Sequence, residues 1–229
     1  MTTDPIFNDL QAVMEAGQEL EVLNFYHCFP VTCKARVESI DRETVLLKVQ
    51  PPGSVLLEGQ AHTNLLGQGL PEALKAAIDS FDLRSGSLLL RDFTYTGADF
   101  GKRMVARVHP ENPIPVEIEG SGQPAAGQLV DISLSGIGVQ VSEVAFARGQ
   151  AVKATLALPG GTVALPGKVL NLSPIPGQPA ARLSIGFSRS EPETALILHY
   201  IKDRRAEILA EVATMYECAQ RAQDQAPSE

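Results

Sequence analysis

The stretch GQLVDISLSGIGVQV, residues 127–141, combines alternating side chains with turn-forming residues. Alternation with a period of two is typical of β-strands, because successive side chains point to opposite faces of a sheet. Asp131 and Ser133 stand two positions apart, so in a strand they point to the same face. Gly136 follows them, at a position where a side chain would obstruct a close approach. The stretch therefore predicts a strand that presents a carboxylate and a hydroxyl side by side.

Short runs of the same character continue on both sides of this stretch. They lie in residues 111–187 and again in residues 20–62, and Pro and Gly separate them at short intervals. Strands this short and frequent, without intervening helices, favour closed antiparallel barrels. Between the two groups, residues 99–110 have the composition of a loop. The sequence thus predicts a mainly β protein, with one domain in residues 1–98, a linker in 99–110, and a second domain in 111–222.

Helical spacing of apolar residues appears mainly at the two ends of the chain. Residues 4–16 predict a short leading helix, and residues 191–215 predict one long amphipathic helix. Inside the first domain, LPEALKAAIDSF (70–81) predicts an added helical turn, and SVLLEGQAH (54–62) predicts a strand. We therefore expect a long C-terminal α-helix after the barrels.

Composition excludes several classes of protein. The formal net charge of -8 and pI of about 5.1 disfavour nucleic-acid and anionic-lipid partners, which are usually met by a basic face. No cationic leader and no run of 18 apolar residues is present, so we expect a cytoplasmic protein without membrane insertion. Three cysteines are an odd number and predict reduced thiols, and the spacing of His27, Cys28 and Cys33 does not predict a metal site.

Enzyme signatures are also missing from the sequence. GTVALPGKV has the wrong spacing for a phosphate-binding loop, and no nucleophile elbow, zinc-protease helix or dinucleotide fingerprint occurs. Asp and Glu are abundant, but no spacing selects a pair for acid–base work. We expect no catalytic residues and no cofactor.

Three cations stand out in this acidic chain. Lys102, Arg103 and Arg107 are the only Lys or Arg residues between Asp92 and Ala147. Guanidinium groups offer paired donors to phosphate oxygens and to the O6 and N7 atoms of guanine, and an aspartate accepts hydrogen bonds from guanine N1 and N2. Together with the Asp-x-Ser stretch, these residues predict a site for a ligand that contains phosphate and a purine.

The two motifs in this order resemble the PilZ domain, the bacterial receptor module for cyclic di-GMP. Arg-x3-Arg is followed by Asp-x-Ser-x-x-Gly, and KRMVARV (102–108) and ARLSIGF (181–187) also resemble the family's sequences. The resemblance covers about residues 100–218 and implies a six-stranded antiparallel barrel with a C-terminal helix. It implies cyclic di-GMP as the ligand, bound by Lys102, Arg103, Arg107, Asp131, Ser133 and Gly136. Lys102 stands where many members have Arg, which leaves open whether one nucleotide or an intercalated pair binds.

The first domain is similar to the N-terminal split barrel of two-domain PilZ proteins known as flagellar brakes. The similarity is carried by CKARVESIDRETVLLKVQPP (33–52) and LLEGQAH (56–62). It implies that the nucleotide orders the linker, changes the orientation of the two domains and regulates motility or surface behaviour. Flagellar motor or switch proteins are the implied partners, with recruitment to the flagellar basal body, and the chain is expected to be a monomer or homodimer.

Two alternatives stay open at this point. One is a PilZ adaptor that does not bind nucleotide and acts on pili or polysaccharide export through protein contacts. The intact arginine, aspartate and serine positions argue against it. The other is a flavin-dependent reductase, because split barrels resemble flavin-reductase-like folds, but residues 1–98 show no phosphate-binding constellation.

Overall fold

The computed structural model describes residues 5–97, 107–120, 124–142, 146–187 and 191–225 of the 229-residue chain. The chain divides into two compact units. The first is built from the described residues of 1–26, 30–104 and 208–229, and the second from those of 27–29 and 105–207. Within the described residues, no helix is long and apolar enough to cross a membrane.

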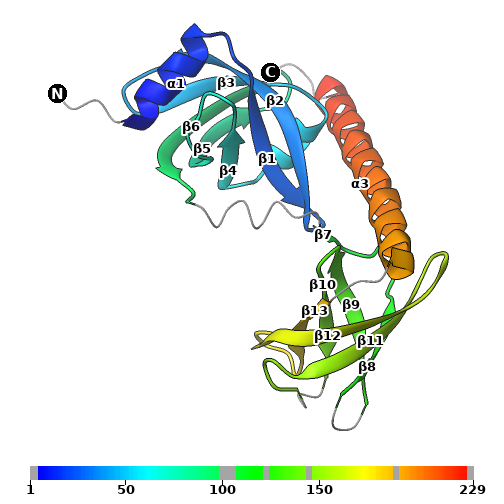
Figure 1. Ribbon diagram of the computed structural model, residues 1–229. Helices are drawn as coiled ribbons and strands as arrows, with labels where there is room; N and C mark the ends of the chain where they lie inside the picture. The colour runs from blue at the N-terminus through cyan, green and yellow to red at the C-terminus, as the bar shows by residue number, and fades with distance from the viewer. Residues whose placement is uncertain (1–4, 98–106, 121–123, 143–145, 188–190, 226–229) are drawn as a thin grey trace. The chain divides into compact units, whose positions relative to one another are not determined.

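The first unit contains the leading helix, a short 3-10 helix, a closed barrel of six antiparallel strands and residues 208–225 of the last helix (Figure 1). Around the barrel the strands follow the order β1-β2-β3-β6-β5-β4. The elements are α1 (Pro5–Glu15), β1 (Leu20–Tyr26), β2 (Phe29–Ile40), β3 (Thr44–Val49), η1 (Gly53–Leu57), β4 (His62–Leu66), β5 (Leu74–Asp82) and β6 (Ser87–Tyr95).

Alternating apolar residues fill this barrel. Leu88 and Leu90 of β6 are fully buried, and Leu10 of α1 joins the same core cluster from outside the barrel wall. The spacing of the apolar residues in α1 places one face of that helix on the barrel, as the sequence predicts. Burial of these aliphatic side chains is the main source of stability for the unit.

The second unit is built around another six-stranded antiparallel barrel (Figure 1). Its strands run β10-β13-β12-β11-β8-β9, and β9 pairs with β10 to close the ring, while the short β7 is added to β9. The elements are β7 (Arg107–Val108), β8 (Pro115–Glu119), β9 (Ala125–Ser133), β10 (Gly136–Val141), β11 (Ala151–Leu158), β12 (Gly161–Pro174) and β13 (Ala181–Phe187). The last helix, α3 (Glu191–Gln225), follows them, and its residues up to 207 belong to this unit.

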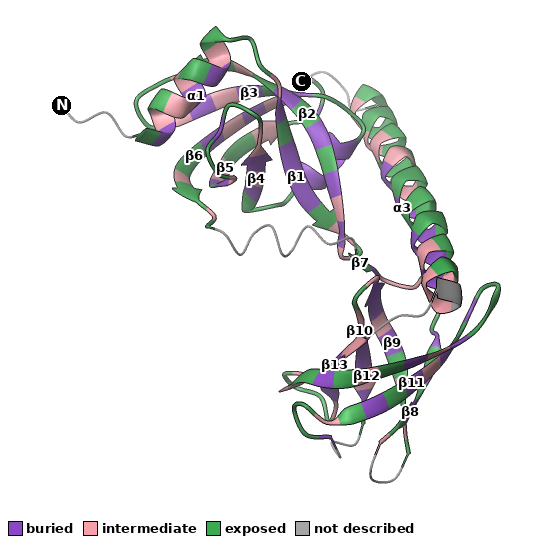
Figure 2. Ribbon diagram, in the orientation of Figure 1, coloured by how far each residue is buried: buried purple, intermediate pink, exposed green. Residues whose placement is uncertain are grey.

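Period-two burial is clear in this barrel as well. In β11, Val152, Ala154, Leu156 and Leu158 are buried and the residues between them are more exposed, which Figure 2 shows as alternating colours. The predicted fold class is therefore confirmed: the protein has two six-stranded antiparallel barrels and a long C-terminal helix.

Two local predictions were wrong. Residues 70–81 do not form a helical turn, because strand β5 pairs there with β4 and β6, and this pairing overrides the helix propensity of its alanines. Residues 54–57 of the predicted strand 54–62 belong instead to the 3-10 helix η1, whose five residues, 53–57, are all buried and do not alternate. In the predicted linker, Arg107 and Val108 form β7.

Candidate ligand-binding site

The pairing of β7 with β9 brings the two sequence motifs together. Arg107 lies opposite Ser133, and Val108 lies opposite Ile132 in this antiparallel ladder. Val108 and Ile132 are both fully buried, so they anchor the short strand. On the other side of β9, Ser133 pairs with Gly136 of β10. Arg107, Ser133 and Gly136 therefore lie next to one another across three strands.

Asp131 is a buried carboxylate between two arginines. Its side chain is only 1% exposed, whereas those of Arg107 and Arg182 are 52% and 39% exposed. Nη1 of Arg107 lies 3.5 Å from Oδ1, and Nη2 of Arg182 forms an ion pair with Oδ2. Within the described residues, Oδ1 accepts no hydrogen bond. Within the described residues, one oxygen of a buried acid thus lacks a hydrogen bond and lies beside accessible guanidinium groups.

Gly138 makes room for this arrangement. It pairs directly with Asp131 across β9 and β10. A Cβ atom at Gly138 would lie 2.5 Å from Oδ2 of Asp131, which is too close, and 3.2 Å from Nε of Arg182, which is tight. The missing side chain therefore lets the carboxylate cross β10 and reach Arg182 on β13.

Sequence reasoning missed both Arg182 and Gly138. A single arginine in a strand has no motif, and its proximity to Asp131 follows only from the pairing of β10 with β13. The sequence did hold one indication that such a residue exists. If Asp131 points into the protein, its buried carboxylate needs a positively charged partner.

Ser133 is buried and its hydroxyl stabilises the turn that joins β9 and β10. Oγ donates a hydrogen bond to the Gly136 carbonyl at 3.1 Å and accepts one from the Ser135 N–H at 3.3 Å. Gly136 has a packing reason of its own, because a Cβ there would lie 2.6 Å from the carbonyl oxygen of Ile185. The close approach that the sequence predicts at Gly136 is thus made by the neighbouring strand β13, which packs against β10 at this position.

Replacing Ser133 by alanine should therefore destabilise the ligand-free protein by about 1 kcal/mol, because the partly buried Gly136 carbonyl and the Ser135 N–H lose their hydroxyl partner. Urea unfolding measures this change. Ser135→Ala is the control, since the Ser135 hydroxyl contributes only a 3.4 Å contact with the Ser133 hydroxyl. An equal cost for the two variants would contradict the role of Ser133.

Two of the expected ligand residues, Lys102 and Arg103, lie outside the described residues. Of the six expected residues, the structure places Arg107, Asp131, Ser133 and Gly136 together, as described above.

A cysteine and a histidine lie beside this cluster in the second unit. Sγ of Cys28 lies 2.8 Å from the ring nitrogen Nε2 of His109. The backbone N–H of His109 donates a hydrogen bond to the backbone carbonyl of His27 at 3.0 Å. Burial raises the pKa of Cys28, and the negative charge of Asp131 raises it further. Burial also lowers the pKa of His109, against the opposing effect of Asp131. Both groups therefore favour their neutral forms. Within the described residues, no three His, Cys, Asp or Glu side chains are grouped to hold a metal ion.

The lowered pKa of His109 predicts a pH effect on stability. The unfolded chain binds a proton on this histidine more readily than the folded chain does, so acidification favours unfolding. This stability contribution is present above the ordinary histidine pKa and is lost as pH falls through it toward the lower folded value. Urea unfolding at pH 7 and pH 5 should show a smaller loss of stability for His109→Gln than for the wild type. An identical loss in both proteins would contradict this prediction.

Comparison with known proteins identifies the region that holds these residues. Residues 102–203 match the family model described as PilZ domain. An uncharacterized protein of Aquifex aeolicus is 30% identical over 132 residues, which are 56% of this chain and 62% of that protein. The chain therefore matches less than two thirds of the length of this relative.

Solved structures with a similar arrangement of elements share little sequence with this chain. YcgR from Escherichia coli in complex with c-di-GMP is 13% identical, with a TM-score of 0.44, over 93% of this chain and 95% of that one. The K. pneumonia MrkH–c-di-GMP complex is 13% identical, with a TM-score of 0.47, over 92% and 97% of the two chains. The Bacillus subtilis inhibitor of motility (MotI/DgrA) is 13% identical, with a TM-score of 0.45, over 83% and 97%.

The family match spans both motifs, from the cationic segment to the Asp-x-Ser-x-x-Gly hairpin, and it includes all six strands of the second barrel. It ends at Asp203, within the first half of α3. On these grounds, residues 102–203 of this chain are similar to the PilZ domain, and they hold both sequence motifs.

Proposed function

We propose that this protein is a receptor for cyclic di-GMP and has no catalytic activity of its own. One observation carries the proposal: the motif residue Arg107 lies 3.5 Å from the buried carboxylate of Asp131 and directly opposite Ser133. A half-exposed guanidinium beside a buried acceptor suits a ligand that combines phosphate with guanine.

The proposed contacts follow from the chemistry of each group. Arg107 donates to a phosphate oxygen or to the O6 and N7 edge of guanine. The free Oδ1 of Asp131 accepts from guanine N1 or N2. Ser133 and Gly136 form the hairpin turn beside them, and Arg103 and Lys102 supply further positive charge from the linker. Lys102 attracts phosphate as a point charge without the planar fork of arginine, which bears on whether one nucleotide or two bind.

Arg182 belongs to the same proposed site as a positioning residue. Its ion pair with Oδ2 holds the Asp131 carboxylate in one orientation, with Oδ1 turned toward Arg107. Guanine offers donors to that oxygen, whereas the corresponding edge of adenine offers an acceptor at N1. The Arg182–Asp131 pair therefore supports selectivity for guanine.

The proposed output is a change in domain orientation. In this proposal, residues 1–98 form one domain, residues 111–222 form the other, and the nucleotide orders the segment 99–110 between them. A ligand shifts such an equilibrium only by its difference in affinity for the two states. The loaded protein would then act on motility or surface behaviour through flagellar motor or switch proteins, in the cytoplasm and at the flagellar basal body.

Two measurements on the full chain test this proposal. Isothermal titration calorimetry should show saturable binding of cyclic di-GMP and much weaker binding of cyclic di-AMP, which lacks the guanine donors. Small-angle X-ray scattering should show a changed profile when cyclic di-GMP is added. Absence of binding would overturn the receptor function, whereas binding without a change in scattering would overturn the switch alone.

A further inference from the structure

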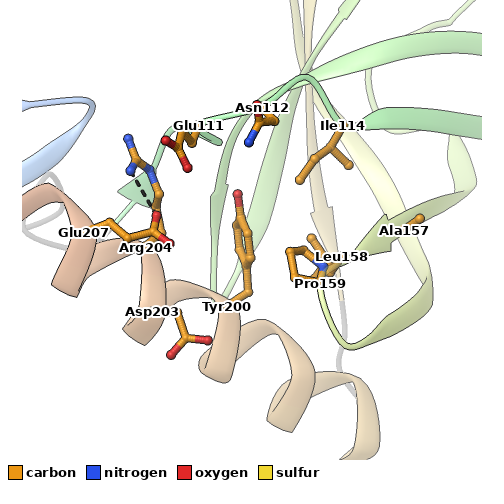
Figure 3. Close-up of a pocket in the computed structure, with 10 residues that line it drawn as sticks. All are labelled: Glu111, Asn112, Ile114, Ala157, Leu158, Pro159, Tyr200, Asp203, Arg204 and Glu207. Carbon is orange, nitrogen blue, oxygen red and sulfur yellow. Dashed lines mark hydrogen bonds and ion pairs between the residues drawn. The ribbon is translucent and has the colours of Figure 1, made fainter.

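A pocket of about 320 Å³ lies in the second unit, and none of its lining residues belongs to the proposed nucleotide site. Three parts of the chain surround it: one face of α3, the end of β11 with the following turn, and the segment between β7 and β8. Figure 3 shows the side chains of these parts converging on one space.

The pocket has an apolar side and a charged side. Ile114 and Leu158 are 8% and 5% exposed and form the apolar wall together with Pro159. Glu111 and Glu207 stand on the opposite side, and the ring of Tyr200 lies between the two sides in Figure 3. An occupant must therefore combine an apolar part with a polar or charged part.

Tyr200 is the feature that points to an occupant. The residue is only 8% exposed, and in Figure 3 its hydroxyl points into the space between Glu111 and Asn112. Among the described residues, this hydroxyl has no hydrogen-bond partner, and its oxygen is not among the fully buried unpaired atoms, so it is accessible from the pocket. Burial raises the pKa of Tyr200, with Glu207 and Glu111 adding to the rise and Arg204 opposing it. The hydroxyl therefore stays protonated at neutral pH.

The charges around the pocket favour a cation. Arg204, the positive residue of the pocket, is 3% exposed, donates to the His109 carbonyl at 3.0 Å and pairs with Glu207 at 3.0 Å. Its charge is thus already compensated. Glu111 forms no hydrogen bond or ion pair with any described residue, and Asp203 lies at the rim with His199 3.3 Å away. The uncompensated charge that faces the pocket is negative.

We infer that this pocket binds a cation carried on an aliphatic chain, such as an alkylguanidinium or an alkylammonium group. The head group lies against the Glu111 carboxylate and the Tyr200 hydroxyl, and the methylene chain lies along Ile114, Leu158 and Pro159. Long cationic side chains bury their stems on apolar surface in this way while the charge stays near water. The same chemistry is found in a free polyamine and in an arginine or lysine side chain of a protein.

Ligand titrations followed by NMR test the inference on the full chain with labelled tyrosine rings. The probes are agmatine, N-acetyl-arginine methylamide, and N-acetyl-citrulline methylamide as the uncharged analogue of nearly the same shape. We expect both cations to shift the Tyr200 signal saturably, with dissociation constants on the order of millimolar, and the citrulline probe to bind about tenfold more weakly or worse. Tighter binding of agmatine would indicate a free polyamine, and tighter binding of the arginine amide would indicate a protein side chain.

Variants provide the second part of this test. Glu111→Gln should weaken binding of the arginine amide by up to about fivefold, the range for an exposed ion pair. Glu119→Gln removes the same charge from an exposed residue of β8 outside the pocket and should leave the affinity unchanged. Tyr200→Phe identifies the Tyr200 signal and should weaken binding as well. The inference is overturned if no probe shifts the Tyr200 signal, if citrulline binds as tightly as arginine, or if the two Glu→Gln variants behave alike.

Discussion

Replacing Arg107 by alanine is expected to weaken cyclic di-GMP binding by about 30-fold or more, and replacing Arg103 should have a similar effect. Truncation of one partner in a charged contact of this kind costs about 2 to 5 kcal/mol of binding energy. Arg107 is already held beside Asp131 and opposite Ser133, so the alanine variant removes the guanidinium without rebuilding the site. Isothermal titration calorimetry on each variant measures the change.

Two further variants make this result specific. Arg107→Lys keeps the charge but loses the planar fork, so its affinity should lie between those of the wild type and the alanine variant. Arg148→Ala removes an exposed cation from the same unit outside the site and should bind normally. Unchanged affinity in Arg107→Ala and Arg103→Ala would remove the basis for the assigned site.

The ion pair between Arg182 and Asp131 should respond unequally to the loss of its two members. Arg182→Ala leaves a carboxylate that is 1% exposed and that, among the described residues, has Arg107 at 3.5 Å and no hydrogen bond on Oδ1. A buried charge without its partner is costly, so we expect a loss of about 1 to 3 kcal/mol in the free energy of unfolding. Asp131→Asn leaves two arginines that are 39% and 52% exposed and can turn toward water, at a cost below about 1 kcal/mol.

Urea unfolding of the ligand-free variants measures this asymmetry. The double variant Arg182→Ala/Asp131→Asn should be more stable than Arg182→Ala alone, because the uncompensated charge is then gone. Arg182→Lys keeps a positive charge near Asp131 and should recover part of the stability and of the nucleotide affinity. If Asp131→Asn costs as much as Arg182→Ala, then burial of the carboxylate does not control the energetics of this site.

The sequence predicts the architecture because its main signals are local. Period-two burial in the barrels and helical spacing in α1 are visible residue by residue, and the fold class follows from them. The failure at residues 70–81 comes from pairings between distant segments. Residues 74–82 have good helix formers, yet β4 and β6 hold them as a strand. Tertiary context outweighs local propensity at such a position.

The residues of the proposed site also fall into two groups, those that the sequence identifies and those that only the structure identifies. Arg107, Asp131, Ser133 and Gly136 could be named from spacing, since they belong to two short motifs. The distances between these residues could not be predicted from the sequence, because they depend on the pairing of β7 with β9. Arg182 and Gly138 could not be named at all. The first is a lone arginine on β13, and the second has a clear role only once Asp131 is seen to cross it.

The central claim is that cyclic di-GMP binds where Arg107, Asp131 and Ser133 meet, and one NMR experiment tests it most directly. Backbone amide signals of the full chain are recorded while cyclic di-GMP is added. We predict saturable shifts concentrated at residues 107–108 of β7, at 131–138 around the β9–β10 hairpin and at 182–184 of β13. Shifts confined to other parts of the protein, or no shifts with the nucleotide in excess, would contradict the account.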